Sequence, residues 1–191
     1  MPLPTSGAAL YAGPANEFVK MAPESSLTAH VTREFNRRWG TATESEIRSW
    51  KNSLTALARV VEAAKLGHSG VGVELKLPFT NKRIDCSFVA RDSSGQPQVR
   101  IVELKQWSAA APSAYPDNVV VGAKEMLHPS VQAAAYASYL RDSHSAFTED
   151  GFGLASCAYL HNMSADDAQS LRGLQYAGAI NEAPFDSANR R

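Results

Sequence analysis

Residues 71–105 read VGVELKLPFTNKRIDCSFVARDSSGQPQVRIVELK, and this stretch decides the fold. Hydrophobic and polar residues alternate in three segments, a pattern typical of β-strands that bury one face. Turn-forming residues separate the segments at 78–81 and at 92–95. The sequence therefore predicts a three-stranded antiparallel meander with strands at 71–77, 83–90 and 99–105.

The two turns also predict the register of these strands. The numbers of paired residues in an antiparallel hairpin have a constant sum, which the turn centres set at 159 and 188. Glu74 is then opposite Asp85, and Asp85 is opposite Glu103, so the three carboxylates form one row with neighbours about 5 Å apart. Lys105 shares the face of Glu103, and both side chains are expected on the exposed face of the sheet. The core face carries Ile84, Cys86, Phe88, Ala90, Val102 and Leu104.

A row of three carboxylates has two interpretations. Like charges opposite each other destabilise a sheet, and a divalent cation removes that repulsion. Carboxylate oxygens, a backbone carbonyl and waters form the oxygen shell that Mg²⁺ prefers. A metal ion with a lysine beside it is suited to hydrolysing a phosphodiester, because the cation acidifies water and neutralises charge on the phosphate. The alternative is a solvent-facing sheet surface whose charges serve solubility alone.

Helices are predicted on the N-terminal side of the meander. Two short helical stretches between residues 17 and 39 are separated at Pro23. Residues 43–46 read Thr-Glu-Ser-Glu, which has the form of a capping box. An apolar stripe at helical spacing follows this box, so the next helix is expected to end near Gly67. Residues 1–14 are rich in proline and glycine and are expected to form an extended or poorly ordered lead-in.

The C-terminal side of the meander adds a helix and a strand. Residues 107–127 have an irregular pattern, and a helix with Pro129 in its first turn is predicted from His128 to about His144. The apolar segment 152–160 is typical of a strand buried on both faces. The predicted order is helix, three strands, helix, strand, which indicates an α/β fold.

Composition limits the function. The chain has 191 residues with 19 Lys and Arg against 19 Asp and Glu, which argues against a non-specific polycation for nucleic acid. The first 105 residues carry a net charge of +4 and the rest carry −4. This uneven distribution is compatible with a local surface that faces phosphates. Two cysteines are too few for a disulfide framework, and no apolar run reaches the roughly 20 residues of a membrane span. A cytoplasmic protein with no membrane contact is expected.

Basic residues cluster in the second helical stretch. Arg33, Arg37 and Arg38 lie close together there. They form either a solvated helix face or, less favoured, a phosphate contact.

Two motifs resemble those of a known superfamily. The pattern Asp85-x17-Glu103-Leu-Lys105, on adjacent strands after a helix and a first strand, resembles the signature of the PD-(D/E)XK nucleases. Gln132-x3-Tyr136 on the following helix resembles the QxxxY motif of the RecB-type nucleases in that superfamily. Over about residues 10–165, the chain is also similar to the nuclease-like module at the N-terminus of some Schlafen-related bacterial helicases.

The resemblance implies a fold and its boundaries. The fold is the restriction-endonuclease-like αβββαβ core, a central mixed sheet flanked by helices, with extra N-terminal helices. A flexible lead-in at residues 1–14 would precede a nuclease-like domain at residues 15–165, whose core is 43–162. A C-terminal helix and tail would occupy residues 166–191.

The resemblance also implies a metal site. Asp85 and Glu103 would bind Mg²⁺, for which Mn²⁺ can substitute, with the carbonyl of Leu104 as a third ligand. Glu46 is either a further ligand or only the last residue of the capping box. Glu74 is either a ligand or an indirect neighbour of the site.

The remaining motif residues would serve the reaction or the DNA. Lys105 would position or activate the attacking water, or stabilise the transition state. Gln132 and Tyr136 would orient the site or contact the DNA strand. Arg83 would meet a nucleic-acid phosphate or pair with Glu74 or Asp85. His128 would either contact nucleic acid or, as the favoured interpretation, cap the helix that Pro129 opens.

The expected function is that of a Mg²⁺-dependent nuclease that hydrolyses DNA phosphodiester bonds in repair, recombination or defence against foreign DNA. RNA is a weaker alternative substrate. A different class of function is a catalytically inactive nucleic-acid-binding or regulatory module of the same fold. A helicase domain or partner, and a homodimer, are further expectations, since the chain is either a free-standing nuclease or one domain of a longer protein.

Overall fold

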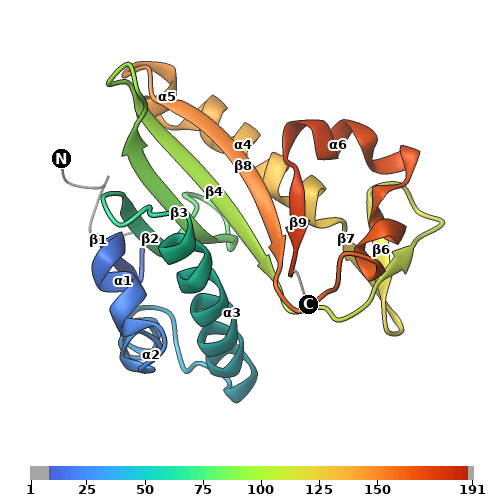
Figure 1. Ribbon diagram of the computed structural model, residues 1–191, viewed down its shortest axis with the longest axis horizontal. Helices are drawn as coiled ribbons and strands as arrows, with labels where there is room; N and C mark the ends of the chain where they lie inside the picture. The colour runs from blue at the N-terminus through green and yellow to red at the C-terminus, as the bar shows by residue number, and fades with distance from the viewer. Residues whose placement is uncertain (1–8, 189–191) are drawn as a thin grey trace. The chain divides into compact units, whose positions relative to one another are not determined.

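The structure is a computed structural model that describes residues 9–188. The chain divides into two compact units, Met1–Gly95 and Gln96–Arg191. Figure 1 shows the elements of each unit in chain order. The first unit contains β1 (Tyr11–Pro14), α1 (Ala15–Met21), α2 (Ser26–Arg38), α3 (Glu44–Ala63), β2 (Gly70–Lys76) and β3 (Arg83–Arg91).

The antiparallel pairing of β2 with β3 confirms the predicted register of the first hairpin. Val73 pairs with Cys86 and Leu75 pairs with Ile84, which gives the expected sum of 159. The side chains of Glu74 and Asp85 therefore lie at the same level of the hairpin. Turn residues at 78–81 hold this register, since Leu77 N–H donates to the Lys82 carbonyl at 3.0 Å.

A third strand, β1, extends this sheet where a flexible lead-in was expected. Residues 1–8 of that lead-in lie outside the described residues, and for residues 9–14 the prediction was wrong. β1 pairs antiparallel with β2, and Tyr11 is opposite Val73. Neighbouring prolines and glycines concealed the strand, because only four residues are extended and their partners lie about 60 positions away in sequence.

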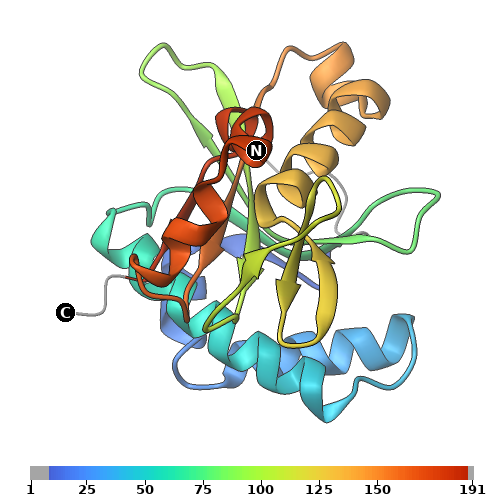
Figure 2. The same cartoon turned by 90° about the vertical axis from the view of Figure 1, so that its right-hand side faces the viewer.

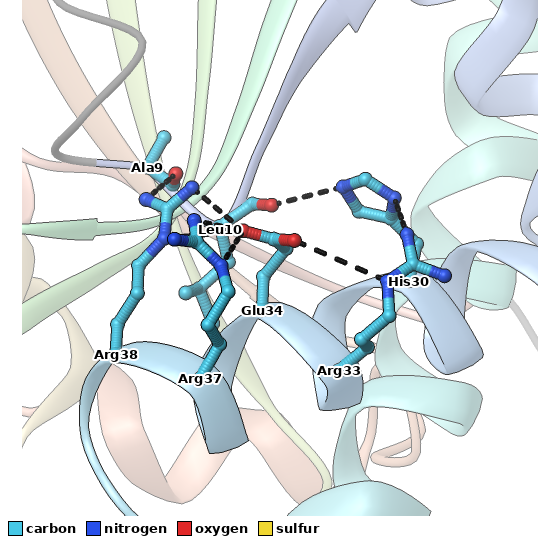
Figure 3. Close-up of polar contacts among 7 residues, drawn as sticks. All are labelled: Ala9, Leu10, His30, Arg33, Glu34, Arg37 and Arg38. Atoms are coloured by element: carbon cyan, nitrogen blue, oxygen red, sulfur yellow. Dashed lines mark hydrogen bonds and ion pairs between the residues drawn. The ribbon is translucent and has the colours of Figure 1, made fainter.

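Helix α2 holds the two residues that precede β1 through polar contacts (Figure 3). The Arg38 guanidinium donates to the Ala9 carbonyl at 2.9 Å and to Glu34 Oε2 at 2.8 Å. Arg37 also donates to Glu34 at 2.7 Å, and these two guanidinium groups lower the pKa of the Glu34 carboxyl to about 2. His30 Nε2 lies 3.2 Å from the Leu10 carbonyl. Arg38 therefore holds the backbone before β1 against α2, whereas Arg37 and Glu34 form an ion pair on the helix surface.

The helices of the first unit follow the predicted pattern closely. Thr43 and Glu46 form the capping box at the start of α3, with both reciprocal hydrogen bonds present. The helix ends at Ala63, a few residues before the predicted Gly67, and Lys65 adopts a φ of 56° just beyond it. The buried apolar residues of the three helices include Phe18, Leu27, Val31, Leu54, Leu57 and Val61.

The second unit contains a parallel sheet of three strands in the order β4, β8, β9. Glu103 is level with Ala158 and Lys105 with Leu160. Helix α4 packs against β4 and β8, as Figure 1 shows. The elements are β4 (Pro97–Lys105), β5 (Ala111–Pro112), β6 (Asn118–Val121), β7 (Lys124–Leu127), α4 (Pro129–Ser143), α5 (Ser145–Thr148), β8 (Gly153–Leu160), η1 (Asp167–Arg172), η2 (Leu174–Tyr176), α6 (Ala177–Glu182) and β9 (Phe185–Ser187).

Three expectations for this unit were wrong. Residues 107–127 are not irregular throughout, because β5, β6 and β7 form a small antiparallel sheet, drawn in yellow in Figure 2. Strand β8 buries alternate residues rather than both faces. The C-terminal tail contributes β9 in addition to a helix, and β9 adds an edge strand whose Phe185 joins the buried cluster around Leu160 and Tyr176.

Both units combine helices with strands, and both antiparallel and parallel pairs occur, so the predicted α/β class with both strand directions is confirmed. Among residues 9–188, no helix is both long and apolar enough to cross a lipid bilayer.

Candidate active site

The second unit brings together the four motif residues that the sequence places in it. Glu103 and Lys105 lie two positions apart in β4, so both project from the same face of the strand. The Lys105 ammonium donates to Glu103 Oε1 at 2.7 Å. It also donates to the side-chain Oε1 of Gln132 at 2.9 Å. Strand alternation and one helix contact are therefore enough to assemble this group.

Helix α4 supplies the other half of the group. Gln132 and Tyr136 are four residues apart and share one face of the helix. Because Gln132 accepts from Lys105 through Oε1, its amide nitrogen faces the other way and donates to the Tyr136 hydroxyl at 3.0 Å. The result is a continuous chain of hydrogen bonds from Glu103 through Lys105 and Gln132 to Tyr136. We call these four residues the β4–α4 cluster.

The β4–α4 cluster is buried, which corrects the expectation of an exposed sheet face. Glu103 is only 2% exposed, and the side chain of Lys105 is 12% exposed. Helix α4 packs over this face of β4, which brings Gln132 close enough to Lys105 to accept its hydrogen bond. Ionised groups are costly to bury unless they are paired, so solubility does not account for them here.

An aromatic ring, that of Trp107, also contacts this cluster. The Lys105 ammonium lies 5.2 Å from the centroid of the Trp107 ring. Trp107 also packs against the buried apolar cluster of the second unit. The period-two spacing of Glu103, Lys105 and Trp107 is the signal that could have revealed this contact. The ring therefore limits the positions that the ammonium can adopt.

The first unit holds a second polar group, centred on Glu74. Trp50 Nε1 donates to Glu74 Oε1 at 2.9 Å, and Arg83 Nε donates to the other carboxylate oxygen at 2.5 Å. Arg83 also forms an ion pair with Glu46 at 3.5 Å. Both oxygens of the Glu74 carboxylate thus have protein donors, which favours an indirect role over metal binding. Trp50 is 5% exposed and holds this carboxylate in place.

Burial raises the pKa of Glu74, and the nearby Asp85 carboxylate raises it further. Arg83 and Trp50 act in the opposite direction but do not cancel these effects. Glu74 also has a φ of 52°, in the left-handed region that a glutamate seldom adopts. An unusual backbone conformation beside a perturbed carboxyl is a feature that functional sites share. The structure thus places Asp85, the predicted metal ligand, next to a tightly held acidic residue.

Two predicted nucleic-acid contacts have structural partners instead. Arg83 pairs with Glu74, which the sequence left as an alternative, and also with Glu46, which it did not predict. His128 is fully buried, so its interpretation as a nucleic-acid contact was wrong. Its Nδ1 accepts from Ser130 N–H at 3.1 Å as the N-cap of α4, which confirms the capping role. Burial also lowers the pKa of His128 and favours its neutral form.

The oxygen donors of the predicted metal site fit Mg²⁺ in chemical type. Glu103 and Asp85 offer carboxylate oxygens, and Leu104 is a half-buried residue of β4 whose carbonyl remains the predicted third ligand. Among residues 9–188, no three or more His, Cys, Asp or Glu side chains lie close enough together to hold a metal ion. The pairing of Asp85 with Glu103, whose members belong to different units, stays a prediction.

Comparison with known protein families, with curated proteins and with solved structures finds no match to this chain.

Proposed function

We propose that this protein is a Mg²⁺-dependent nuclease of the PD-(D/E)XK type, which hydrolyses phosphodiester bonds of DNA. The observation that carries the proposal is the hydrogen-bond chain of the β4–α4 cluster. Its four residues were singled out from two separate sequence motifs, and they meet around one ammonium group. A buried ion pair contributes little net stability compared with an apolar replacement, which favours a chemical role for this pair.

In the proposed reaction, Lys105 acts on the phosphate or on the attacking water. A lysine ammonium has three N–H donors, of which Glu103 and Gln132 take two. The third is suited to hold a phosphate oxygen or to orient the attacking water. Gln132 keeps the ammonium in place, and Tyr136 fixes the orientation of the Gln132 amide. The chain thus provides a positioned cation within a largely buried site, where electrostatic effects are stronger than in water.

The two motif carboxylates complete the proposal. Glu103 and Asp85 would hold Mg²⁺ together with the carbonyl of Leu104, as the resemblance to the PD-(D/E)XK nucleases implies. When bound, Mg²⁺ would supply an acidified water and neutralise charge on the phosphate. Glu74 would influence the metal only indirectly, through the neighbouring Asp85, because its own oxygens accept hydrogen bonds from Trp50 and Arg83.

Incubation of the full chain with linear duplex, nicked duplex and single-stranded DNA tests the proposal. We expect cleavage of at least one substrate with Mg²⁺ or Mn²⁺ and none with EDTA. The Glu103→Gln variant keeps the volume and a hydrogen-bond acceptor for Lys105, so it should fold but fail to cleave. Cleavage that survives EDTA, or a Glu103→Gln variant as active as the parent, would contradict the proposal. DNA binding without cleavage under all these conditions would favour the inactive binding module.

A further inference from the structure

An open groove lies at the turn between β2 and β3, entirely within the first unit. It has a volume of about 460 Å³, and its lining includes Trp39, Lys76, Phe79 and Asn81. None of these residues belongs to the β4–α4 cluster or to the Glu74 group. The groove therefore requires an explanation of its own.

Phe79 is the most unusual residue of this groove. Its side chain is completely exposed to solvent. Its φ is 56°, a left-handed conformation that turns normally assign to glycine or asparagine. A bulky ring in this conformation is disfavoured both by its backbone and by its exposure. Such an outlier points to a role outside the fold, because neither packing nor turn geometry explains it.

One positive charge lines the groove. Lys76 is exposed, and among residues 9–188 its ammonium group forms no ion pair. The Lys76 ammonium lies 5.8 Å from the centroid of the Trp39 ring. Arg83 lies against the same ring, but Glu74 and Glu46 compensate its charge. The Trp39 ring is therefore occupied by cation–π contacts with Lys76 and Arg83, whereas the exposed Phe79 ring is available for stacking.

A stacking surface beside an uncompensated cation matches the chemistry of single-stranded nucleic acid. Exposed bases stack on aromatic rings, and lysines neutralise the phosphates between them. A duplex keeps its bases stacked on one another, so it could use only the lysine. We propose that this groove binds single-stranded DNA, with a base on Phe79 and a phosphate on Lys76. This inference rests on the proposed nuclease function and adds where the strand is held.

The position of the groove suits that role. Asp85 follows Lys82 by three residues along the hairpin, which is about 10 Å of extended chain. A DNA strand bound at the turn between β2 and β3 would therefore pass within a few nucleotides of Asp85, the predicted metal ligand. The groove would select single-stranded substrate before cleavage.

Fluorescence anisotropy with a labelled oligothymidylate, in EDTA so that nothing is cut, tests the groove. We expect Phe79→Ala to weaken binding by ~5- to 150-fold, the usual effect of losing one stacked base. The matched control is Tyr115→Ala, which removes an exposed aromatic ring from the other unit and should leave binding unchanged. Phe79 makes no buried contact, so the variant should keep the circular dichroism spectrum of the parent.

Salt dependence tests Lys76 in the same assay. Lys76→Ala should lower the slope of log affinity against log salt by about 0.7, the value for one phosphate contact on a single strand. Lys124→Ala, an exposed lysine of β7, should not change it. The proposal is overturned if the parent binds no oligothymidylate, if Phe79→Ala binds as the parent does, or if Phe79→Ala weakens a duplex equally. This binding test is independent of the cleavage test with Glu103→Gln. The protein could show no Mg²⁺-dependent cleavage and still bind oligothymidylate in EDTA more weakly after Phe79→Ala.

Discussion

Replacement of Lys105 by methionine tests the electrostatic account of the β4–α4 cluster. Methionine keeps most of the apolar stem but removes the ammonium group that joins Glu103 to Gln132. The Glu103 carboxylate would then remain in a site where it is 2% exposed. We expect the Lys105→Met variant to be much less stable at pH 7, because a buried charge loses its counter-ion.

The size of the effect follows from the burial of the pair. Removing one partner of a buried ion pair costs about 3–5 kcal/mol. The lower end applies here, since the Lys105 side chain is 12% exposed and water can partly replace the ammonium. A loss of about 3 kcal/mol in the free energy of unfolding would lower the urea midpoint by roughly 1.5 M, for a slope near 2 kcal/mol/M.

Urea denaturation followed by circular dichroism measures this loss. Lys124→Met, an exposed lysine of the same unit, is the matched control and should change stability by less than about 0.5 kcal/mol. Adding Glu103→Gln to Lys105→Met should restore much of the lost stability, because the unpaired charge is then gone. The reasoning is refuted if Lys105→Met is no less stable than Lys124→Met, or if the two cluster substitutions destabilise additively.

Three further predictions concern other parts of the chain. The pKa of Glu74 is raised in the folded state, so the free energy of unfolding that this group contributes at low pH is lost as the pH rises through that pKa. Glu74→Gln should therefore remove the corresponding fall in urea midpoints measured between pH 4 and 8. An unchanged fall in the variant would contradict this prediction. Gln132→Leu should lower the initial rate of Mg²⁺-dependent cleavage by ~10- to 100-fold because the Lys105 ammonium loses its support, and a parental rate would exclude that role. Arg38→Ala should accelerate amide hydrogen exchange in β1, because the guanidinium holds the Ala9 carbonyl just before that strand, whereas Arg33→Ala, whose guanidinium contacts His30 and Glu34 within α2, should leave the exchange unchanged.

The register and the helix face could be predicted from the sequence because both depend on local chemistry. Turn residues at 78–81 determine which residues of β2 and β3 pair, and that alone places Glu74 level with Asp85. The spacing of Gln132 and Tyr136 needs only the period of a helix. The capping box and the helix-opening Pro129 likewise act within a few residues.

The elements that were missed depend on partners that are distant in sequence. β1 and β9 are short edge strands whose patterns are too brief to detect, and each is extended because a long-range neighbour accepts it. Burial of Glu103 was missed for the same reason. Alternation shows that Glu103 and Lys105 share a face, but only the docking of α4 determines that this face is covered. A sequence pattern therefore locates the motif residues better than it locates their surroundings.

The cleavage rate of the Lys105→Met variant tests the central claim most directly. Single-turnover cleavage of labelled DNA in Mg²⁺, without urea and at a temperature where the parent and both lysine variants are folded, compares their rates. The account predicts at least a ~100-fold loss for Lys105→Met, since one well-placed group that stabilises the transition state has an effect of that size, and a parental rate for Lys124→Met. Cleavage by Lys105→Met at the parental rate would contradict it.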